Sequence, residues 1–565
     1  MQIVSQLAPQ RLNLLRPAAA QAAPLAPEFV PAAPTDGLSR NVALQAPPTL
    51  EAARSLQTAG KTAGASSTQK IEELIARALM DPEAEKQLIG LLQVLNATGQ
   101  LKPMLHELAQ SAADSGALPP IPEGKRNEMV DQAAGMIDAQ FRERGLTPDT
   151  VGAVYVDWPE LSAQHLAAVR DTQAPPRMVG GISLLTDPTF VAELETLQGA
   201  KFVSGNAVKV LNDGPESFAE RDRMIAGAKD SIHLMSWAFY DDKTGLETAR
   251  ALIEKAKEGV DVKVIVDGQV SVKGHHDAPI RLLEDNGVSV VRWRDADRPY
   301  DGNHRKMMIV DGQEAVIGGL NIGDVYSHKA GETKWRDTDV LLAGPAVDEG
   351  AKLFARLWTE QVEGTGKSQV ELYGKASPVV GAVKSAVVDH LPGPKGDAHI
   401  MLATMKAIEG ATESVDIENA YFINTPGMKD VLLKALADGV KVRILTNSAE
   451  SIDEPLITAP ILASMPELMA AGAEIYLKKG DTLHSKFMIV DGLFTSVGSH
   501  NHHPRSQRFE GEMVLNSLDT ATATELTSDF VADISAAQRV RTVEELNIPQ
   551  SPLGALAMRY FFDAL

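Results

Sequence analysis

One pattern of residues occurs twice in this chain, about 180 residues apart. The segment NHRKMMIVDG occupies 303–312, and LHSKFMIVDG occupies 483–492. Each copy has a His, a Lys two positions later, an apolar run and an Asp-Gly pair, and each continues into a Gly and an Asn at the same spacing. Chance agreement at these offsets is on the order of 10⁻⁷ per starting position at ordinary composition. The chain therefore contains an internal duplication.

The segments before the two motifs also correspond to each other. The matching segments are 230–245 and 413–427, 255–268 and 434–448, and 286–293 and 471–480. The second pair has the pattern of an amphipathic helix end, a Gly and a Val/Ile-rich strand, and the third has a Gly followed by a short strand. Strand, helix, strand and strand in this order predict a duplicated α/β fold whose sheet is largely parallel and covered by helices.

Four regions follow from composition and periodicity. Residues 1–66 are rich in Ala and Pro and predict a disordered tail, whereas apolar residues at helical spacing predict a small helical region over 67–150. The duplicated part divides into a first half, 151–368, and a second half, 369–565.

Composition restricts the partners and the compartment. The net charge of −21 gives no general attraction to a nucleic-acid backbone. The absence of cysteine excludes disulfides and thiol chemistry, and no apolar run is long enough to span a membrane. We expect a soluble or peripheral membrane protein, with a cytoplasmic and a secreted location both left open. For the N-terminal tail, a leader is the alternative to plain disorder. For 553–565, membrane docking is the alternative to core packing.

The duplicated motif contains groups suited to phosphate chemistry. The first copy contains His304, Lys306, Asp311, Gly318, Gly319 and Asn321, and the second contains His484, Lys486, Asp491, Gly498, Ser499 and Asn501. In a strand, residues two apart face the same way, so each His and Lys would point into one site. An imidazole can attack or deprotonate, and a cation and an amide can bind phosphate oxygens, so these groups suit reaction at a phosphodiester. The alternative is a pair of ordinary strand histidines in core hydrogen bonds.

The blocks HRKMMIVDGQEAVIGGLN and HSKFMIVDGLFTSVGSHN resemble the paired HKD motifs of the phospholipase D superfamily. The flanks at 318–347 and 498–515 are similar to those of bacterial cardiolipin synthases. IENAYF at 417–422 is instead closer to phosphatidylcholine-cleaving phospholipases than to the TPYF of the synthases. The resemblance covers roughly 180–545.

The resemblance implies two pseudo-symmetric α/β/α sandwich halves, with mixed, largely parallel sheets, that form one active site. One histidine attacks phosphorus and the other serves as acid and base; the family's usual order makes His304 the nucleophile and His484 the acid/base. The residues expected to hold the phosphate oxygens are Lys306, Lys486, Asn321 and Asn501. The chemistry requires no metal and no cofactor.

The family supplies each imidazole with a downstream acid. Glu512 fits this position in the second half, and Asp337 is its counterpart in the first, with Glu332 and Asp339 as nearby alternatives. The motif aspartates, Asp311 and Asp491, belong to the candidate catalytic set by motif membership.

Both motif aspartates precede Gly at turns, which favours a structural role for them. Gly318, Gly319 and Ser499 are expected beside the phosphate. Gly319 stands where the family usually has Ser, so one hydroxyl is absent from the first copy.

The histidines of HNHHP, which are His500, His502 and His503, are expected in a solvated loop, with a metal or headgroup site as the alternative.

The function predicted is that of a phosphatidyltransferase or phospholipase D acting on glycerophospholipids through a phosphohistidine intermediate, similar to cardiolipin synthase. Its expected partners are a phospholipid, a membrane surface and an alcohol or water acceptor. A phospholipase D hydrolase, for example a secreted effector, is the first alternative. A nuclease of the same superfamily and a non-catalytic binding module are the others; the acidic charge opposes the nuclease, and the complete motifs oppose the binding module.

Overall fold

The computed structural model describes residues 71, 74, 82–114, 122–143, 157–271, 276–295, 301–370, 377–391, 397–454 and 457–548. Residue contacts divide the chain into a short unit, Met1–Glu51, and a larger unit, Ala52–Leu565. All of the described residues belong to the larger unit. The predicted tail at 1–66 and the segment 553–565 considered for membrane docking lie outside the described residues.

One mixed sheet runs through the larger unit, in the order β16-β12-β11-β10-β13-β14-β15-β9-β1-β8-β7-β6-β2-β3-β4, with β5 paired to β15. The strands of the first half are β1 (Val203–Asn212), β2 (Ser231–Ser236), β3 (Asp261–Asp267), β4 (Ser289–Trp293), β5 (Gly302–Asn303), β6 (Met307–Val310), β7 (Glu314–Gly318) and β8 (Thr338–Ala343). Those of the second half are β9 (Val383–His390), β10 (Ser414–Asn419), β11 (Lys441–Thr446), β12 (Glu474–Leu477), β13 (Lys486–Val490), β14 (Phe494–Gly498), β15 (Glu510–Leu518) and β16 (Gln538–Val540).

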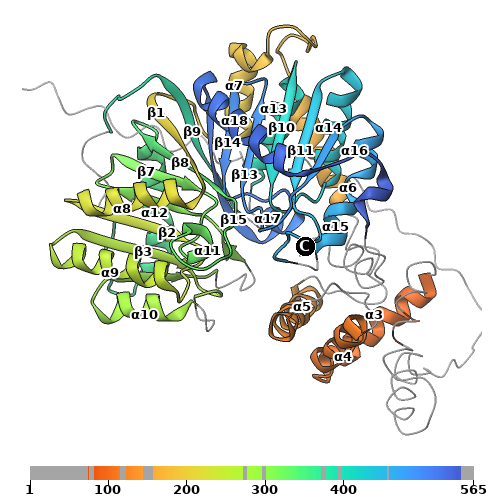
Figure 1. Cartoon of the computed structure of the whole chain (residues 1–565), viewed down its shortest axis with the longest axis horizontal. Helices are drawn as coiled ribbons and strands as arrows, with labels where there is room; N and C mark the ends of the chain where they lie inside the picture. The colour runs from red at the N-terminus through yellow and green to blue at the C-terminus, as the bar shows by residue number, and fades with distance from the viewer. Residues whose placement is uncertain are drawn as a thin grey trace, which may run out of the picture. The chain divides into compact units, whose positions relative to one another are not determined.

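The strand order repeats when it is read outward from the central β1–β9 pair. β8, β7, β6, β2, β3 and β4 follow β1, and β15, β14, β13, β10, β11 and β12 follow β9. β1 and β9 are antiparallel, with Val203 opposite Ser385, which relates the two halves by a pseudo-twofold axis. Figure 1 shows the halves in yellow-green and blue, joined at these strands. The predicted fold of two pseudo-symmetric α/β halves is confirmed.

The sheet is mixed, as predicted, but it is not largely parallel. Parallel pairing is confined to β2–β3–β4, β10–β11–β12 and the short β5–β15 pair, and the inner strands are antiparallel. The Asp-Gly pairs explain the difference. Asp311 and Gly312 have φ +51° and +65°, Asp491 and Gly492 have φ +52° and +58°, and they turn the β6–β7 and β13–β14 hairpins. An Asp-Gly pair between apolar runs is a hairpin signal.

Helices connect the parallel strands and cover the sheet. α9 (Lys243–Lys257) connects β2 to β3, and α14 (Pro426–Asp438) connects β10 to β11. Each is followed by a glycine with φ +96°, Gly259 or Gly439, as the predicted helix, glycine and strand pattern requires. The other helices of the two halves are α8 (Asp213–Gly227), α10 (Asp277–Asp285), α11 (Asp324–Ser327), α12 (Val347–Val362), α13 (His399–Gly410), α15 (Thr458–Ala463), α16 (Pro466–Ala470), α17 (Pro504–Arg508), α18 (Thr520–Ala536) and the 3₁₀ turn η4 (Val543–Leu546).

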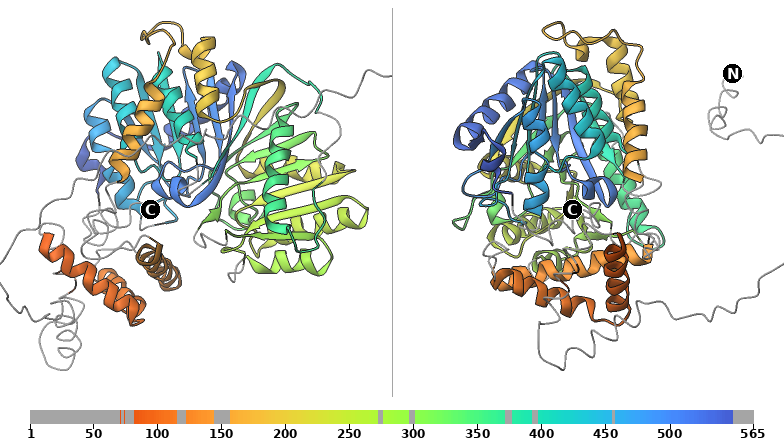
Figure 2. Two further views of the ribbon diagram at one scale, coloured as in Figure 1. Left: turned by 180° about the vertical axis from the view of Figure 1, so that it is seen from behind. Right: turned by 90° about the vertical axis from the view of Figure 1, so that its right-hand side faces the viewer.

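The residues just before β1 pack on the second half, although the sequence predicts that the first half begins at 151. α6 (Asp157–Arg170) and α7 (Pro188–Leu197), with the 3₁₀ turn η2 (Leu184–Thr186) before it, contact α13, and α6 also contacts α14. Val169, Phe190 and Leu194 are buried in the apolar core of the second half. Figure 2 shows these orange helices among the blue ones. The first half therefore begins at β1.

Among the described residues of the region 67–150, the structure has the helices α3 (Pro82–Ala97), α4 (Leu101–Asp114) and α5 (Glu123–Glu143). They share a small core that includes Leu88, Leu108 and Ile137. Within the described residues, no helix combines the length and the apolar character that crossing a bilayer requires.

Candidate active site

Both His-x-Lys segments lie in extended chain that leads into a buried strand. His304 follows β5 and Lys306 comes one residue before β6, whereas Lys486 is the first residue of β13. The histidines therefore lie just outside the strands in which the sequence predicts them. His and Lys still lie together, because Lys306 Nζ donates to His304 O at 2.6 Å and Lys486 Nζ lies 3.0 Å from His484 Nδ1. All four residues are buried.

Each motif histidine is hydrogen-bonded to an acid from the other half. His304 Nδ1 lies 3.0 Å from both carboxylate oxygens of Glu512. His484 Nδ1 lies 2.7 Å from Asp337 Oδ2. Sequence reasoning named both acids but assigned neither of them to a particular histidine, and the structure pairs them crosswise.

The two acids considered as alternatives to Asp337 lie in other surroundings. Glu332 is exposed. Asp339 accepts hydrogen bonds from Ser217 Oγ at 2.5 Å and from Arg221 Nη2 at 2.8 Å. Asp337 is therefore the acid of this segment that meets a motif histidine.

Backbone hydrogen bonds hold the two crossed contacts in the same register. His304 N donates to Gly511 O at 2.9 Å, and His484 N donates to Arg336 O at 2.7 Å. Gly511 and Arg336 each precede the acid of their contact. The backbone of one half thus fixes where the histidine of the other half meets its carboxylate.

The motif asparagines differ in their hydrogen bonding. Asn321 Oδ1 accepts from Ala238 N at 3.2 Å, and its Nδ2 donates to the Tyr326 hydroxyl at 3.0 Å. Asn501 Oδ1 is buried and has no hydrogen-bond partner among the described residues. The two amides, which the sequence treats as equivalent, therefore have different surroundings.

Burial dominates the charge states of the histidine–acid contacts. It lowers the pKa of both His304 and His484 well below the usual value, and the neighbouring lysine of each motif adds to this effect. Burial also raises the pKa of Glu512 to about 7 and that of Asp337 to about 6. Low solvation favours the uncharged form of each group.

The two motif lysines are also affected by burial. It lowers the pKa of Lys306 to about 7 and that of Lys486 to about 8, partly offset by the carboxylates of both halves. Each lysine further lowers the pKa of the histidine in the other motif. The two motifs are thus close enough to form one electrostatic site.

Glu510 is a site residue that sequence reasoning missed. One donor atom each of His304, Glu510 and Glu512 lies within 4.8 Å of the others, and this is the one cluster of metal-ligating side chains found among the described residues. Arg505 Nε donates to Glu510 Oε1 at 2.8 Å. Burial raises the pKa of Glu510, but the charges of His304 and Arg505 outweigh it and keep that pKa below its usual range. Strand alternation was the available signal, since Glu510 and Glu512 share one face of β15.

The position equivalent to Glu510 in the first half holds an aromatic ring. Trp335 stands two residues before Asp337, and its ring centroid lies 5.5 Å from that of His484. Tyr326 also packs edge-on against His484 at 5.2 Å. His304 therefore has a second carboxylate as neighbour in addition to the Trp237 ring, whereas the neighbours of His484 at these positions are aromatic.

Gly319 and Ser499 occupy equivalent positions, but both face an acid. A Cβ atom on Gly319 would lie 2.1 Å from Asp337 Oδ1, so a serine does not fit there. The Ser499 hydroxyl donates to Glu512 Oε2 at 2.5 Å, and the Ser506 hydroxyl donates to Glu512 Oε1 at 2.6 Å. These contacts support the carboxylate of the second half and differ from the phosphate contact expected for this hydroxyl.

Gly318, also expected beside the phosphate, closely approaches the neighbouring strand. A Cβ atom there would lie 2.1 Å from Asp339 Oδ1 and 2.5 Å from Thr338 O. Its lack of a side chain therefore permits β7 and β8 to pack.

Asp311 and Asp491, included with the candidate catalytic residues, lie at the opposite ends of β6 and β13 from the motif histidines. Asp311 accepts from the backbone N–H groups of residues 229–231 at 2.8–3.2 Å. Asp491 accepts from those of residues 412–414 at 2.8–3.1 Å. Both hold the start of a neighbouring strand, which agrees with the structural role that the turns favour.

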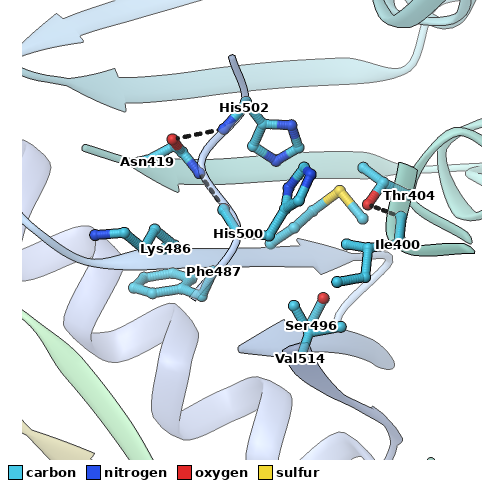
Figure 3. Close-up of a pocket in the computed structure, with 10 residues that line it drawn as sticks. Ile400, Thr404, Asn419, Lys486, Phe487, Ser496, His500, His502 and Val514 are labelled. Atoms are coloured by element: carbon cyan, nitrogen blue, oxygen red, sulfur yellow. Dashed lines mark hydrogen bonds between the residues drawn. The ribbon is translucent and has the colours of Figure 1, made fainter. Parts of the chain in front are cut away.

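The histidines of HNHHP are packed against the protein, and the expectation of a solvated loop is wrong. His500 and His503 are each 4% exposed, and His503 Nδ1 accepts from Ser506 N at 3.0 Å. Figure 3 shows His500 and His502 at a small pocket beside Asn419 and Thr404. Burial lowers the pKa of His502 and His503 to about 4. They are thus neutral groups that pack behind the second motif.

The arrangement provides two imidazoles whose Nδ1 atoms are held by carboxylates, which leaves both Nε2 atoms for chemistry. A neutral imidazole can act as a nucleophile or a base, and its protonated form can act as an acid. Two lysines stand beside them, where negative charge on a substrate would gather.

A family model described as "Cardiolipin synthase, PLD-like domain" matches residues 222–358 and 404–534. The cardiolipin synthase of Halalkalibacterium halodurans is 31% identical over 344 residues, which cover 59% of this chain and 67% of that protein. The major cardiolipin synthase ClsA of Bacillus subtilis is 30% identical over 374 residues, which cover 62% of this chain and 73% of that protein.

Among solved structures, phosphatidylserine synthase from Haemophilus influenzae Rd KW20 superposes with a TM-score of 0.53. The match covers 66% of this chain and 97% of that one, at 15% sequence identity. It supports the two-halved fold.

Proposed function

The chain belongs to the phospholipase D superfamily, in the family of cardiolipin synthase PLD-like domains, and we propose that it is a phosphatidyltransferase acting on glycerophospholipids. The observation that carries this proposal is the crossed contact of His304 with Glu512 and of His484 with Asp337. Two oriented imidazoles in one buried site suit a transfer in two steps, with a covalent intermediate between them.

In the first step, His304 Nε2 attacks phosphorus and the bond from phosphorus to the headgroup oxygen breaks. His484, which the bound phosphodiester anion favours in its protonated form, gives its Nε2 proton to the departing alkoxide. In the second step, His484 takes the proton of the incoming alcohol, whose oxygen attacks phosphorus and breaks the bond to His304. Glu512 stabilises the positive charge of the phosphorylated imidazole. The order of the two histidines follows the usual assignment of the family.

The lysines and asparagines of the two motifs hold the non-bridging phosphate oxygens. Lys306 and Lys486 supply positive charge in surroundings of low solvation, where a charge–charge interaction is stronger than in water. Asn321 and Asn501 supply neutral amides. A bound phosphodiester anion would favour the protonated form of both lysines.

The acceptor is an alcohol, and water is its competitor. Because the donor is a glycerophospholipid, the enzyme works at a membrane surface. A second molecule of phosphatidylglycerol as the acceptor would yield cardiolipin. Nucleic acid is a poor candidate for the substrate, since the chain carries a net charge of −21.

The test is to incubate the purified protein with phosphatidylglycerol, and separately with phosphatidylcholine, each with and without a primary alcohol. Lipid products are identified by mass. We expect cardiolipin or a phosphatidyl-alcohol. Phosphatidic acid as the only product would show that the enzyme hydrolyses the lipid and does not transfer it. Cleavage of single-stranded DNA without any lipid product would overturn the lipid assignment.

Variants connect this activity to the site. His304→Asn and His484→Asn are each expected to abolish turnover. His106→Asn is the matched control, because His106 lies on α4, outside both halves. A wild-type rate in either motif variant would exclude the crossed histidines as the reacting groups.

A further inference from the structure

An arginine lies at each of the two histidine–acid contacts, but the two arginines come from positions that the pseudo-twofold does not relate. Arg305 and Ser485 are the middle residues of the two His-x-Lys segments. Arg336 and Gly511 are the residues before the two acids. In the first contact the arginine stands next to the histidine, and in the second it stands next to the acid. Each contact therefore has one arginine, with a small residue at the other position.

Arg305 is fully buried and binds the second half. Its Nε donates to Asp389 Oδ1 at 2.6 Å, and its Nη2 donates to His390 O at 2.7 Å, both on β9. Its Nη1 donates to Asn303 Oδ1 at 3.0 Å. A Cβ atom on Gly511 would lie 2.0 Å from Arg305 Nη1. The guanidinium thus fills the space that a side chain before Glu512 would occupy.

Arg336 makes the corresponding contacts from the other position. Its Nε donates to Asp533 Oδ2 at 2.8 Å, and its Nη2 lies 3.7 Å from Glu418 Oε1, on α18 and β10 of the second half. Its Nη1 donates to Thr338 Oγ1 at 2.8 Å. That hydroxyl in turn lies 2.9 Å from the hydroxyl of Ser485. The small middle residue of the second motif thus lies beside a hydrogen-bond partner of Arg336.

We propose that Arg305 and Arg336 are positioning residues that fix the register in which each histidine meets its acid. Both belong to the first half and both bind charged or carbonyl groups of the second. A shift of the halves would leave a buried guanidinium and its acid unpaired, and an unpaired buried charge is strongly unfavourable. The register of the two crossed contacts is therefore held by charge as well as by backbone hydrogen bonds. The inference deepens the proposed function, because turnover is one of its two readouts.

The test uses substitutions that copy one contact onto the other. Arg305→Ser gives the first motif the middle residue of the second, and Arg336→Gly gives the second acid the neighbour of the first. We expect each to lower kcat by about 100-fold with little change in KM, because a displacement of about 1 Å in the reacting groups has an effect of this size. Gly511→Arg alone is expected to be harmful, since the new side chain meets Arg305.

Adding Gly511→Arg to Arg305→Ser should instead restore at least about one tenth of the lost activity, because the arginine returns to the contact from the other position. The matched control is Arg443→Ser. Arg443 binds Asp416 through two hydrogen bonds of 2.6 Å, and both residues lie inside the second half. This control should lower the melting temperature without lowering kcat per folded molecule.

The second readout needs no substrate. In histidine-labelled protein, the downfield NMR signal of the His304 Nδ1 proton, assigned with His304→Asn, should disappear in Arg305→Ser and return in the double variant. The proposal is overturned if Arg305→Ser keeps that signal, or if its activity falls only with the folded fraction, as in the control. A wild-type protein that turns over no lipid would count against the proposed function, while the NMR signal would still decide the role of the arginines.

Discussion

The Nδ1 atom of His304 lies 3.0 Å from the carboxylate of Glu512, 208 residues further along the chain. The equivalent contact, between His484 and Asp337, spans 147 residues in the opposite direction. Both contacts cross from one half to the other, so neither half contains a complete histidine–acid pair. The catalytic proposal therefore depends on how the halves are joined as much as on either motif.

A double-mutant cycle on folding stability can test this crossed pairing. We expect His304→Asn and Glu512→Gln to couple by about 1–3 kcal/mol in the free energy of unfolding, because the two residues are in contact. His304→Asn and Asp337→Asn should couple more weakly, because these two residues share no hydrogen bond. The measurement is urea unfolding of the single and double variants. Stronger coupling of His304 to Asp337 than to Glu512 would contradict the crossed arrangement.

The two lysines predict a specific pH dependence of the rate. The pKa of Lys306 is lowered to about 7 and that of Lys486 to about 8, so the free enzyme loses positive charge as the pH rises through 7 to 8. kcat/KM, which reports the free enzyme, should fall over this range. A bound phosphodiester raises both pKa values, and the decline in kcat should therefore begin at higher pH. Coincident alkaline limbs for kcat and kcat/KM would show that the phosphate does not contact the lysines.

A serine at position 319 is expected to damage the site, although the second half has Ser499 at the equivalent position. A Cβ atom on Gly319 would lie 2.1 Å from Asp337 Oδ1, so Gly319→Ser must displace the carboxylate that contacts His484. We expect kcat to fall about 100-fold. Ser499→Gly is the control in the opposite direction. It creates no collision and should have a smaller effect, so an equal or larger loss in the control would reject the steric explanation.

The motif aspartates should affect folding and leave the chemistry unchanged. Asp311 accepts three backbone N–H groups at the start of β2, and Asp491 does the same at β10. We expect Asp311→Asn to destabilise the fold by about 1–3 kcal/mol, with kcat per folded molecule unchanged. Denaturant unfolding and the assay at saturating lipid measure the two quantities. A large fall in kcat with unchanged stability would give Asp311 a catalytic role.

The sequence predicts the order of elements well because the duplication can be read directly from it. The helix, glycine and strand pattern at Gly259 and Gly439 is found where expected, since only a left-handed residue ends each helix in this way. The direction of the inner strands differs from the predicted one. The turns at Asp311-Gly312 and Asp491-Gly492 close hairpins, and a hairpin makes its two strands antiparallel.

The site is less predictable because its contacts cross between the halves. Asp337 and Glu512 are recognisable as candidate partners of the histidines from their place after each motif. No spacing reveals that each contacts the histidine of the other half. Glu510 has no counterpart in the first half, where Trp335 stands instead. The duplication therefore could not indicate it.

The crossed contacts also bear on how two copies of one half can diverge. Gly319 leaves room for Asp337, and Ser499 donates to Glu512, so each acid is matched to a residue of its own half and to a histidine of the other. Whether a substitution at one acid is tolerated therefore depends on two distant stretches of chain. The copies are free to drift apart over most of their length, but at these few positions each half carries the selective constraints of the other.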